Sequence, residues 1–343
     1  MKRAFFPFLC LLLWSFDSHA QAPFYQGKTM RIIVGTPPGN LYDLWARLIV
    51  AHMGKHIPGN PDFIVQNMPG AGHVVAANHL FSIAKPDGLT LIGSIIPSLY
   101  LNQLLGRKEI QFDWAKFSWI GSPARGDHQM YMRADTPYKT IEDIRTAKEP
   151  PKCGATGTTG PDSYLPKLLQ EILGAKFSIV TGYPGGTDID LGVERGEVHC
   201  RAFTIEAFFG REPYTTWRKK GFVRNLFQTG EKRDPRLADT PTVFELMDQY
   251  KTPEAGRRLA AVLLAAGSMG RPMLGPPGVP VERLKILREA FRKTMSDPQF
   301  QAELKKRNYE FEPVSGEELE GMAKEITSQP PEILARLKKV LGN

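Results

Sequence analysis

The sequence has few cysteines, no long apolar segment beyond its beginning, and none of the common catalytic signatures. Three cysteines among 343 residues are too few for a disulfide-stabilised small fold. No later window approaches the ~20 apolar residues that a membrane-spanning helix needs. The motifs Gly-x-Ser-x-Gly, His-Glu-x-x-His and Cys-x-x-Cys are missing. These absences argue against a serine hydrolase with a nucleophile elbow, a zinc protease and a dithiol oxidoreductase.

The histidines and carboxylates form no recognisable metal or acid–base pattern. Four of the seven histidines have helix-like spacings but lack a supporting set of acidic ligands: His52, His56, His73 and His79. Such isolated histidines are more often surface or core residues than metal ligands. No spacing fixes a pair of carboxylates as general acid and base. We therefore expect a protein without catalysis, metal or cofactor.

Composition indicates a globular chain that is large enough for two domains. Hydrophobic residues make up 42% and charged residues 23%, while 32 glycines and 28 prolines predict many turns. The formal charge is +8, but its basic runs are scattered at 218–220, 305–307 and 338–339. We interpret these runs as solvated faces and expect no nucleic-acid binding.

The first twenty residues have the pattern of a secretory signal peptide. Lys2 and Arg3 precede an apolar stretch at 5–16, and small residues follow, with cleavage expected after Ala20 or Ala22. The mature chain is therefore predicted to be exported, soluble and periplasmic. Export leaves Cys153 and Cys200, and an oxidising compartment permits a bridge that the sequence alone cannot establish.

Short apolar strands alternate with amphipathic helices along the mature chain, which predicts an α/β fold with largely parallel sheets. One strand–helix series covers about 31–93 and a second covers about 152–204. A long helix is expected at 281–295. The sequence shows no internal repeat.

Three glycine-rich turns, at 35–43, 154–163 and 183–190, each join a predicted strand to a helix. The free backbone N–H groups of a helix start attract anions, and glycine lets a ligand approach the backbone. In α/β sheets such loops meet at the carboxyl edge of the strands, where ligands bind. In the first turn, Asn40 and Asp43 are spaced as a capping box.

The other two turns add hydroxyl donors and a second capping-box spacing. Thr158, Thr159 and Ser163 are candidate donors in the second turn, and Thr187 with Asp190 fits a capping box in the third. Each turn taken singly is also compatible with a simple tight connection. The set of three, split between two halves of the chain, favours a cleft between domains.

The spacing Gly154-x-x-Gly157-x-x-Gly160 after a strand offers an alternative, a dinucleotide-binding turn. Pro161 and Pro166 disfavour it because they fall where the pyrophosphate-binding helix should run without interruption. The motif also begins in the middle of the chain, and an exported protein meets little nicotinamide cofactor.

Motifs spread over nearly the whole mature chain resemble those of Bug-type receptors, the extracytoplasmic solute-binding proteins of tripartite tricarboxylate transporters. The segments that carry the resemblance are 33–39 with Asp43, Ala46 and Arg47, followed by 67–72, 85–91, 239–245, 275–280 and 297–298. The resemblance implies a two-lobe type II periplasmic binding protein, or Venus flytrap, with two hinge-crossing strands. Lobe 1 would hold 23–124 and 230–343, and lobe 2 would hold 125–229. The receptor would be a monomer that captures a small organic anion and delivers it to membrane permease subunits.

The resemblance also nominates a set of ligand-binding residues in the same loops. Together with neighbouring positions, the expected set is Gly39, Asn40, Tyr42, Asp43, Thr158, Thr159, Gly160, Ser163, Tyr164, Gly185 and Gly186. The family commonly has glycine where Asn40 stands, a small hydroxyl residue where Tyr42 stands and histidine where Tyr164 stands. The two tyrosines favour an aromatic or longer carboxylate as ligand.

Two other functions and one covalent link remain open at this point. An exported α/β enzyme could use the glycine-rich loops to bind phosphate or a nucleotide, and a ligand-sensing adaptor could close in the same way as a transport receptor. If the second lobe is wound as in this family, the strands of Cys153 and Cys200 could be neighbours, which would permit a disulfide.

Overall fold

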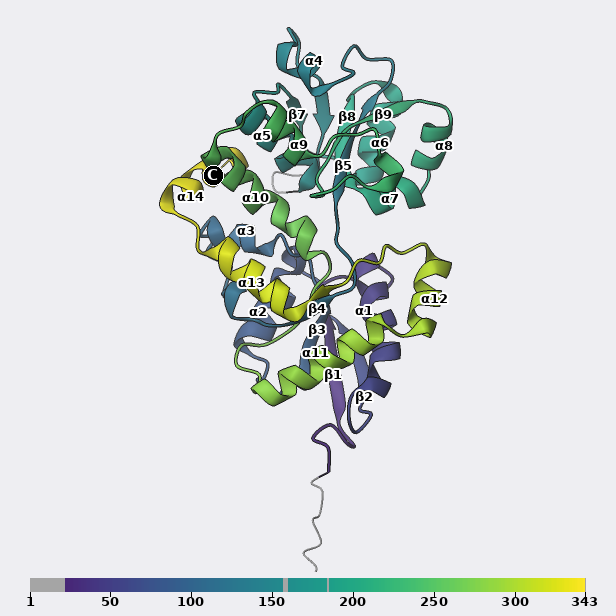
Figure 1. Cartoon of the computed structure of the whole chain (residues 1–343), viewed down its shortest axis with the longest axis vertical. Helices are drawn as coiled ribbons and strands as arrows, with labels where there is room; N and C mark the ends of the chain where they lie inside the picture. The colour runs from purple at the N-terminus through teal and green to yellow at the C-terminus, as the bar shows by residue number, and fades with distance from the viewer. Residues whose placement is uncertain (1–21, 157–159, 184, 343) are drawn as a thin grey trace, which may run out of the picture.

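Two β-sheets, each flanked by helices, form the two lobes of the molecule (Figure 1). The computed structural model describes residues 22–156, 160–183 and 185–342. The predicted signal peptide at 1–20, Thr158 and Thr159 lie outside these described residues. The predicted two-lobe α/β fold is confirmed, because both sheets carry parallel strands and solved binding proteins share the arrangement.

The first lobe is built on a six-stranded sheet in the order β11-β4-β10-β3-β1-β2. Its strands are β1 (Thr29–Val34), β2 (Asp62–Asn67), β3 (Thr90–Ser94), β4 (Ser118–Ser122), β10 (Met273–Gly275) and β11 (Val314–Ser315). Its helices are α1 (Leu41–Met53), α2 (Val74–Ser82), α3 (Leu99–Leu104), α11 (Val281–Met295), α12 (Pro298–Arg307) and α13 (Gly316–Thr327).

The second lobe is built on a five-stranded sheet in the order β7-β6-β8-β5-β9. Its strands are β5 (His128–Arg133), β6 (Lys152–Gly154), β7 (Ser178–Val180), β8 (Cys200–Thr204) and β9 (Val223–Gln228). Its helices are α4 (Ile141–Thr146), α5 (Pro161–Leu173), α6 (Gly186–Arg195), α7 (Ile205–Gly210) and α8 (Tyr214–Lys219). The short 3-10 helices cover Gly54–His56, Ala71–His73, Trp114–Lys116 and Pro235–Leu237.

The strand directions follow from two passages of the chain between the lobes. The chain leaves the first lobe at the end of β4 and enters the second at the start of β5; it returns between β9 and β10. A strand that begins where the chain enters a lobe points away from the other lobe. The strands paired with it in the same sheet point toward the other lobe, so the two directions are opposite. Accordingly β10 is antiparallel to β3 and β4, and β5 is antiparallel to β8 and β9. The sheets are therefore more mixed than the sequence predicted.

Local sequence accounts for the positions of the long helices. Helix α5 begins with Pro161, whose missing N–H costs nothing at a first helical position, and it ends before Gly174 in the left-handed conformation. Helix α11 occupies the predicted range, and its side chains Leu287, Phe291 and Met295 are buried in the first lobe. Helix α1 buries Trp45 and Ile49 in the same cluster.

Three helices of the last third of the chain contact the second lobe. Helices α9 (Val243–Gln249), α10 (Glu254–Met269) and α14 (Pro331–Leu341) each contact α5, while α13 contacts β4 of the first lobe. In Figure 1 the yellow C-terminal segment accordingly extends from the first lobe to the second. The lobe boundaries drawn from the sequence, which place 230–343 in lobe 1, stay a prediction.

A disulfide joins two neighbouring strands of the second sheet. Cys153 on β6 is bonded to Cys200 on β8, with Cα atoms 4.5 Å apart and a sequence separation of 47. The two residues are also direct partners in the parallel pairing of these strands. Among the described residues, no helix is long and apolar enough to cross a membrane.

Candidate functional site

A cavity of about 400 Å³ lies between the lobes and is lined by residues from both. Leu41, Asn308 and Tyr309 come from the first lobe, whereas Gly160 and Arg201 come from the second. Strands β1, β3, β6 and β8 run toward the other lobe, so the loops that follow them converge on this region. The cavity therefore stands where the carboxyl ends of two sheets face each other.

The first predicted loop is stabilised from within by Asp43. This buried carboxylate accepts the Gly39 N–H at 2.8 Å, the Asn67 side-chain amide at 2.8 Å and the Arg47 Nε–H at 3.0 Å. Burial alone would raise the pKa of Asp43, but the bonds from Arg47, Gly39 and Asn67 hold it below its usual value. Asp43 thus fixes the loop rather than offering a free charge to a ligand.

The first predicted capping box is correct only in its first half. Asn40 caps α1 by accepting the Tyr42 N–H at 3.2 Å. Asp43 bonds to Gly39 instead of returning a contact to the Asn40 backbone. The left-handed backbone of Gly39 at φ 80° turns its N–H toward the carboxylate.

The second predicted loop leads into α5, and Asp162 fixes its described part. Asp162 Oδ2 accepts both the backbone N–H and the hydroxyl of Thr156 at 2.9 Å. Gly160 lines the cavity, and the Ser163 hydroxyl is buried without a hydrogen-bond partner among the described residues. An unpartnered buried hydroxyl at a helix start is available to a ligand that reaches it.

The third predicted loop is held by a buried ionic network, and its predicted capping box is wrong. Helix α6 begins at Gly186 after Gly185, with no side-chain cap on its first turn. Asp190 instead accepts hydrogen bonds from Tyr131 at 2.8 Å, from Tyr214 at 2.5 Å and from Arg201 at 3.0 Å. Because Tyr131 and Arg201 belong to strands β5 and β8, Asp190 bonds to side chains of the sheet rather than to the start of its own helix.

Comparison with known proteins identifies the family of this two-lobe chain. Residues 46–334 match the model of the tripartite tricarboxylate transporter family receptor. The chain belongs to this receptor family. The match begins just after the first loop, so residues 39–43 lie outside it. Family members are binding receptors, not enzymes, and the resemblance seen in the sequence is confirmed.

Individual relatives agree with this assignment over nearly their full length. The "UPF0065 protein in gbd 5'region" of Cupriavidus necator is 26% identical over 330 residues, which is 95% of this chain and 92% of that protein. A TctC solute-binding protein from Polaromonas has a TM-score of 0.71 at 20% identity, covering 92% of this chain and 98% of that one. R. palustris Rpa4515 with adipate has a TM-score of 0.63 at 18% identity, with the same coverage.

The receptor's two unusual tyrosines lie in the first turns of α1 and α5, and Tyr42 is half-buried. Tyr164 is almost completely buried, and the Tyr42 ring packs edge-on against His73 with centroids 4.7 Å apart. Burial raises the pKa of both tyrosine hydroxyls. Neither tyrosine lines the interlobe cavity; its aromatic lining comes from Phe203 and Tyr309. An aromatic ligand preference stays a prediction.

His73 is a buried neutral side chain beside the first loop. Its backbone is in the left-handed region at φ 75°, which is costly for a residue with a Cβ atom. Burial lowers its pKa to about 4, so the imidazole is uncharged at neutral pH. Its Nδ1 has no partner among the described residues.

One buried ion pair connects the lobes of the receptor near the cavity. Arg271 follows α10, and its backbone N–H donates to Ser122 of β4 at 2.8 Å. Its guanidinium donates to Glu206 on α7 of the second lobe at 2.5 Å. Burial raises the pKa of the nearby Tyr42 hydroxyl. The positive charge of Arg271 opposes this rise and the negative charge of Glu206 adds to it, so both charges are close enough to act on Tyr42.

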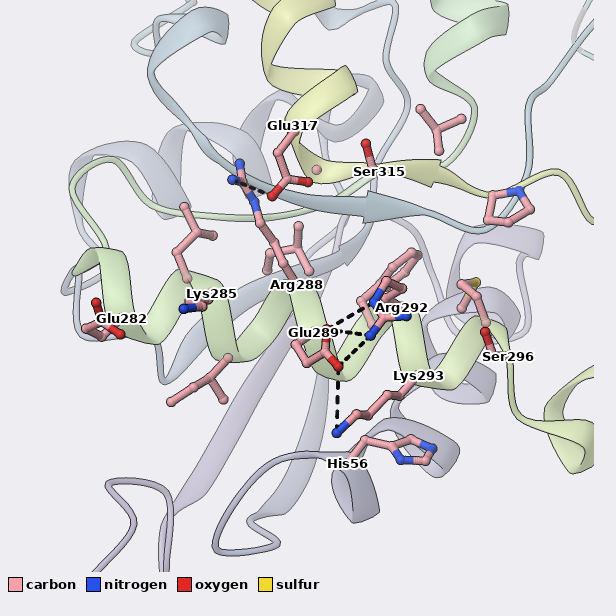
Figure 2. Close-up of a pocket in the computed structure, with 18 of the residues that line it drawn as sticks. His56, Glu282, Lys285, Arg288, Glu289, Arg292, Lys293, Ser296, Ser315 and Glu317 are labelled. Atoms are coloured by element: carbon pink, nitrogen blue, oxygen red, sulfur yellow. Dashed lines mark hydrogen bonds and ion pairs between the residues drawn. The ribbon is translucent and has the colours of Figure 1, made fainter. Parts of the chain in front are cut away.

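A wider groove of about 960 Å³ runs along α11 on the first lobe, away from the predicted loops (Figure 2). Several of its charged side chains pair with one another: Arg292 and Lys293 contact Glu289, and Arg288 contacts Glu317. The residues that line the groove all come from the first lobe, so it is not the candidate ligand site between the lobes.

Sequence reasoning missed several residues that line the interlobe cavity. They are His128, Arg201, Phe203, Glu206, Arg307, Asn308 and Tyr309. Arg307 is the last residue of α12, and Asn308 and Tyr309 follow it, far along the chain from β9, the last strand of the second sheet. Arg201 follows Cys200 on an ordinary strand pattern, so only its position in the folded sheet marks it.

Proposed function

We propose that this receptor captures a small organic carboxylate outside the cytoplasmic membrane and delivers it to the permease subunits of a tripartite transporter. The observation that carries this proposal is the cavity of about 400 Å³ whose wall is shared by both lobes. A ligand bound there contacts both lobes at once, so it favours their closed arrangement. The adipate found with a structural neighbour supports a carboxylate ligand.

The predicted loop residues are proposed to contribute backbone donors rather than charges. Asn40, Gly160 and Gly185 precede the first turns of α1, α5 and α6, while Gly39, whose N–H already donates to Asp43, shapes the first loop. Such N–H groups bind carboxylates without a side-chain cation. Thr158, Thr159 and Gly186 are retained in the proposed ligand set, together with Tyr42, Ser163 and Tyr164, and Asp43 supports this set by fixing the first loop. Export through residues 1–20 and a monomeric receptor complete the proposal.

The test is a thermal-shift screen with malate, adipate, citrate, benzoate and phenylacetate, with adipamide, benzamide and phenylacetamide as neutral controls. A ligand that binds only the folded receptor stabilises it by about 2.7 kcal/mol at 100 times its Kd. We expect at least one acid to raise Tm while its amide does not. Equal responses to acids and amides, or no response to any acid, would contradict carboxylate capture.

Delivery and export are tested in cells of the producing organism. Fractionation is expected to recover the mature chain, lacking residues 1–20, in the periplasmic fraction. Deletion of the receptor gene should abolish uptake of the acid found in the screen. Unchanged uptake would favour the ligand-sensing role over transport.

A further inference from the structure

Arg201 is held by protein at one end of its guanidinium and lacks partners at the other. Its Nη1 donates to the Asp190 carboxylate at 3.0 Å, to the Tyr214 hydroxyl at 2.8 Å and to the Gly186 carbonyl at 3.1 Å. Its Nε is buried without a partner among the described residues. Within the same part of the chain, Nη2 makes no hydrogen bond either. The side chain is only 13% exposed and lines the interlobe cavity.

The unpartnered edge has the shape that recognises a carboxylate. The Nε–H and one Nη2–H of a guanidinium point in parallel and match the two oxygens of a carboxylate. Because Asp190, Tyr214 and Gly186 already fix Nη1, little conformational freedom remains to be lost when a ligand binds. Burial acts to lower the pKa of Arg201, but Asp190, Tyr214 and Tyr131 together raise it above its usual value, so the charge is retained.

The surroundings of Arg201 provide an apolar wall for the remainder of such a ligand. The guanidinium carbon lies over the Phe203 ring, 4.6 Å from the ring centroid, so the ring packs against one face of the guanidinium. Leu41 and Tyr309 line the same cavity from the first lobe. A carboxylate at Arg201 therefore has its carbon skeleton in position to contact the opposite lobe.

We propose that Arg201 binds a carboxylate group of the receptor's ligand through Nε and Nη2, and so selects small organic acids with a free carboxylate. This inference rests on the proposed function, since it concerns the same cavity. It adds a charged anchor on β8 to the backbone donors of the glycine-rich loops.

The experiment compares Arg201→Lys with the unmodified receptor by titration calorimetry, using the acid that gives the largest thermal shift. Lysine keeps the charge beside Asp190 but lacks the paired N–H groups. We expect Arg201→Lys to lose about 10–100-fold in affinity for the acid, the range expected for charge-assisted hydrogen bonds. The matched control is Arg195→Lys on α6, whose exposed side chain lies outside the cavity, and it should bind the acid normally.

A second measurement does not depend on how well the variant folds. The monoamide or amide of the same acid is titrated against the unmodified receptor, and it should bind at least tenfold more weakly than the acid. Equal affinity of acid and amide would overturn the inference, as would Arg201→Lys binding the acid as tightly as the Arg195→Lys control. If no acid binds the unmodified receptor, the proposed function is wrong, and the inference about Arg201 is then wrong as well. If acids bind but Arg201→Lys is unaffected, only the Arg201 anchor fails.

Discussion

At the scale of single residues, the site is organised by carboxylates that stabilise loops instead of meeting ligand. Asp43 accepts hydrogen bonds from Gly39, Asn67 and Arg47, and Asp190 accepts them from Arg201 and two tyrosines. Both carboxylates are almost completely buried. An anion-binding site can therefore contain buried carboxylates. In this receptor each carboxylate holds hydrogen-bond donors of the site in place.

Asp43→Ala is expected to destabilise the receptor by about 1–3 kcal/mol, since the Gly39 N–H and the half-buried Asn67 amide lose their acceptor. Urea unfolding at pH 7 measures the loss. Because the pKa of Asp43 is depressed in the folded state, its stabilisation is present above the unfolded pKa and is lost as the pH falls through the folded one. The difference in free energy of unfolding between Asp43→Ala and the unmodified receptor should therefore become smaller at acidic pH. Asp62→Ala, at an exposed position, should change stability by less than about 0.5 kcal/mol. A similar loss in both variants would show that Asp43 has no special role.

The sequence predicted the role of a single residue correctly where its hydrogen-bond partner lies within a few residues of it in the chain. Asn40 was recognised as a helix cap from its own loop, and α1 confirms it. The partner of Asp190 was not recognisable, because Arg201 and Tyr214 reach it only after β8 and α8 are folded. Arg201 itself carries no local signal at all.

At the scale of helices and strands, alternating apolar strands and amphipathic helices predicted the elements of both sheets well. The strands β1, β2 and β3 form the strand–helix series expected at about 31–93, to within two residues at each end. The antiparallel directions of β5 and β10 were not predicted, because a strand's direction depends on which lobe the chain comes from. Short strands such as β11, with two residues, carry no periodicity from which they could be found.

The disulfide between β6 and β8 links two strands that are paired at a single position. Replacing both cysteines with alanine should lower the free energy of unfolding by about 3–4 kcal/mol, because the cross-link closes a long loop in the unfolded chain. Urea unfolding with and without reductant measures the effect. Reductant should destabilise the parent receptor to a similar extent and leave the double variant unchanged. Alkylation of both thiols in the native exported protein would contradict the bridge.

At the scale of the whole molecule, a buried ion pair connects the two lobes beside the cavity. Arg271 is bonded through its backbone to β4 of the first lobe, and its guanidinium pairs with Glu206 of the second lobe. Both side chains are almost completely buried. The observed arrangement of the lobes is therefore stabilised by two charges that would enter water if the lobes separated.

Glu206→Gln is expected to open the receptor. Removing one partner of a buried pair costs about 3–5 kcal/mol when the other charge stays buried, and separation of the lobes relieves that cost by hydrating Arg271. Small-angle X-ray scattering should then show a larger radius of gyration without ligand. The control replaces an acid of an exposed surface pair, Glu289→Gln, which should leave the radius unchanged. An unchanged radius in the test variant would show that this pair does not hold the lobes together.

The C-terminal segment has a mechanical consequence for this movement. Helix α13 packs on β4 of one lobe, and α14 packs on α5, the helix whose first turn carries the second glycine-rich loop. Only the residues 328–330 separate the two helices. Each opening or closing of the lobes therefore has to bend the chain at these three residues. Substitutions that make this segment more rigid would slow ligand exchange without altering any contact in the interlobe cavity.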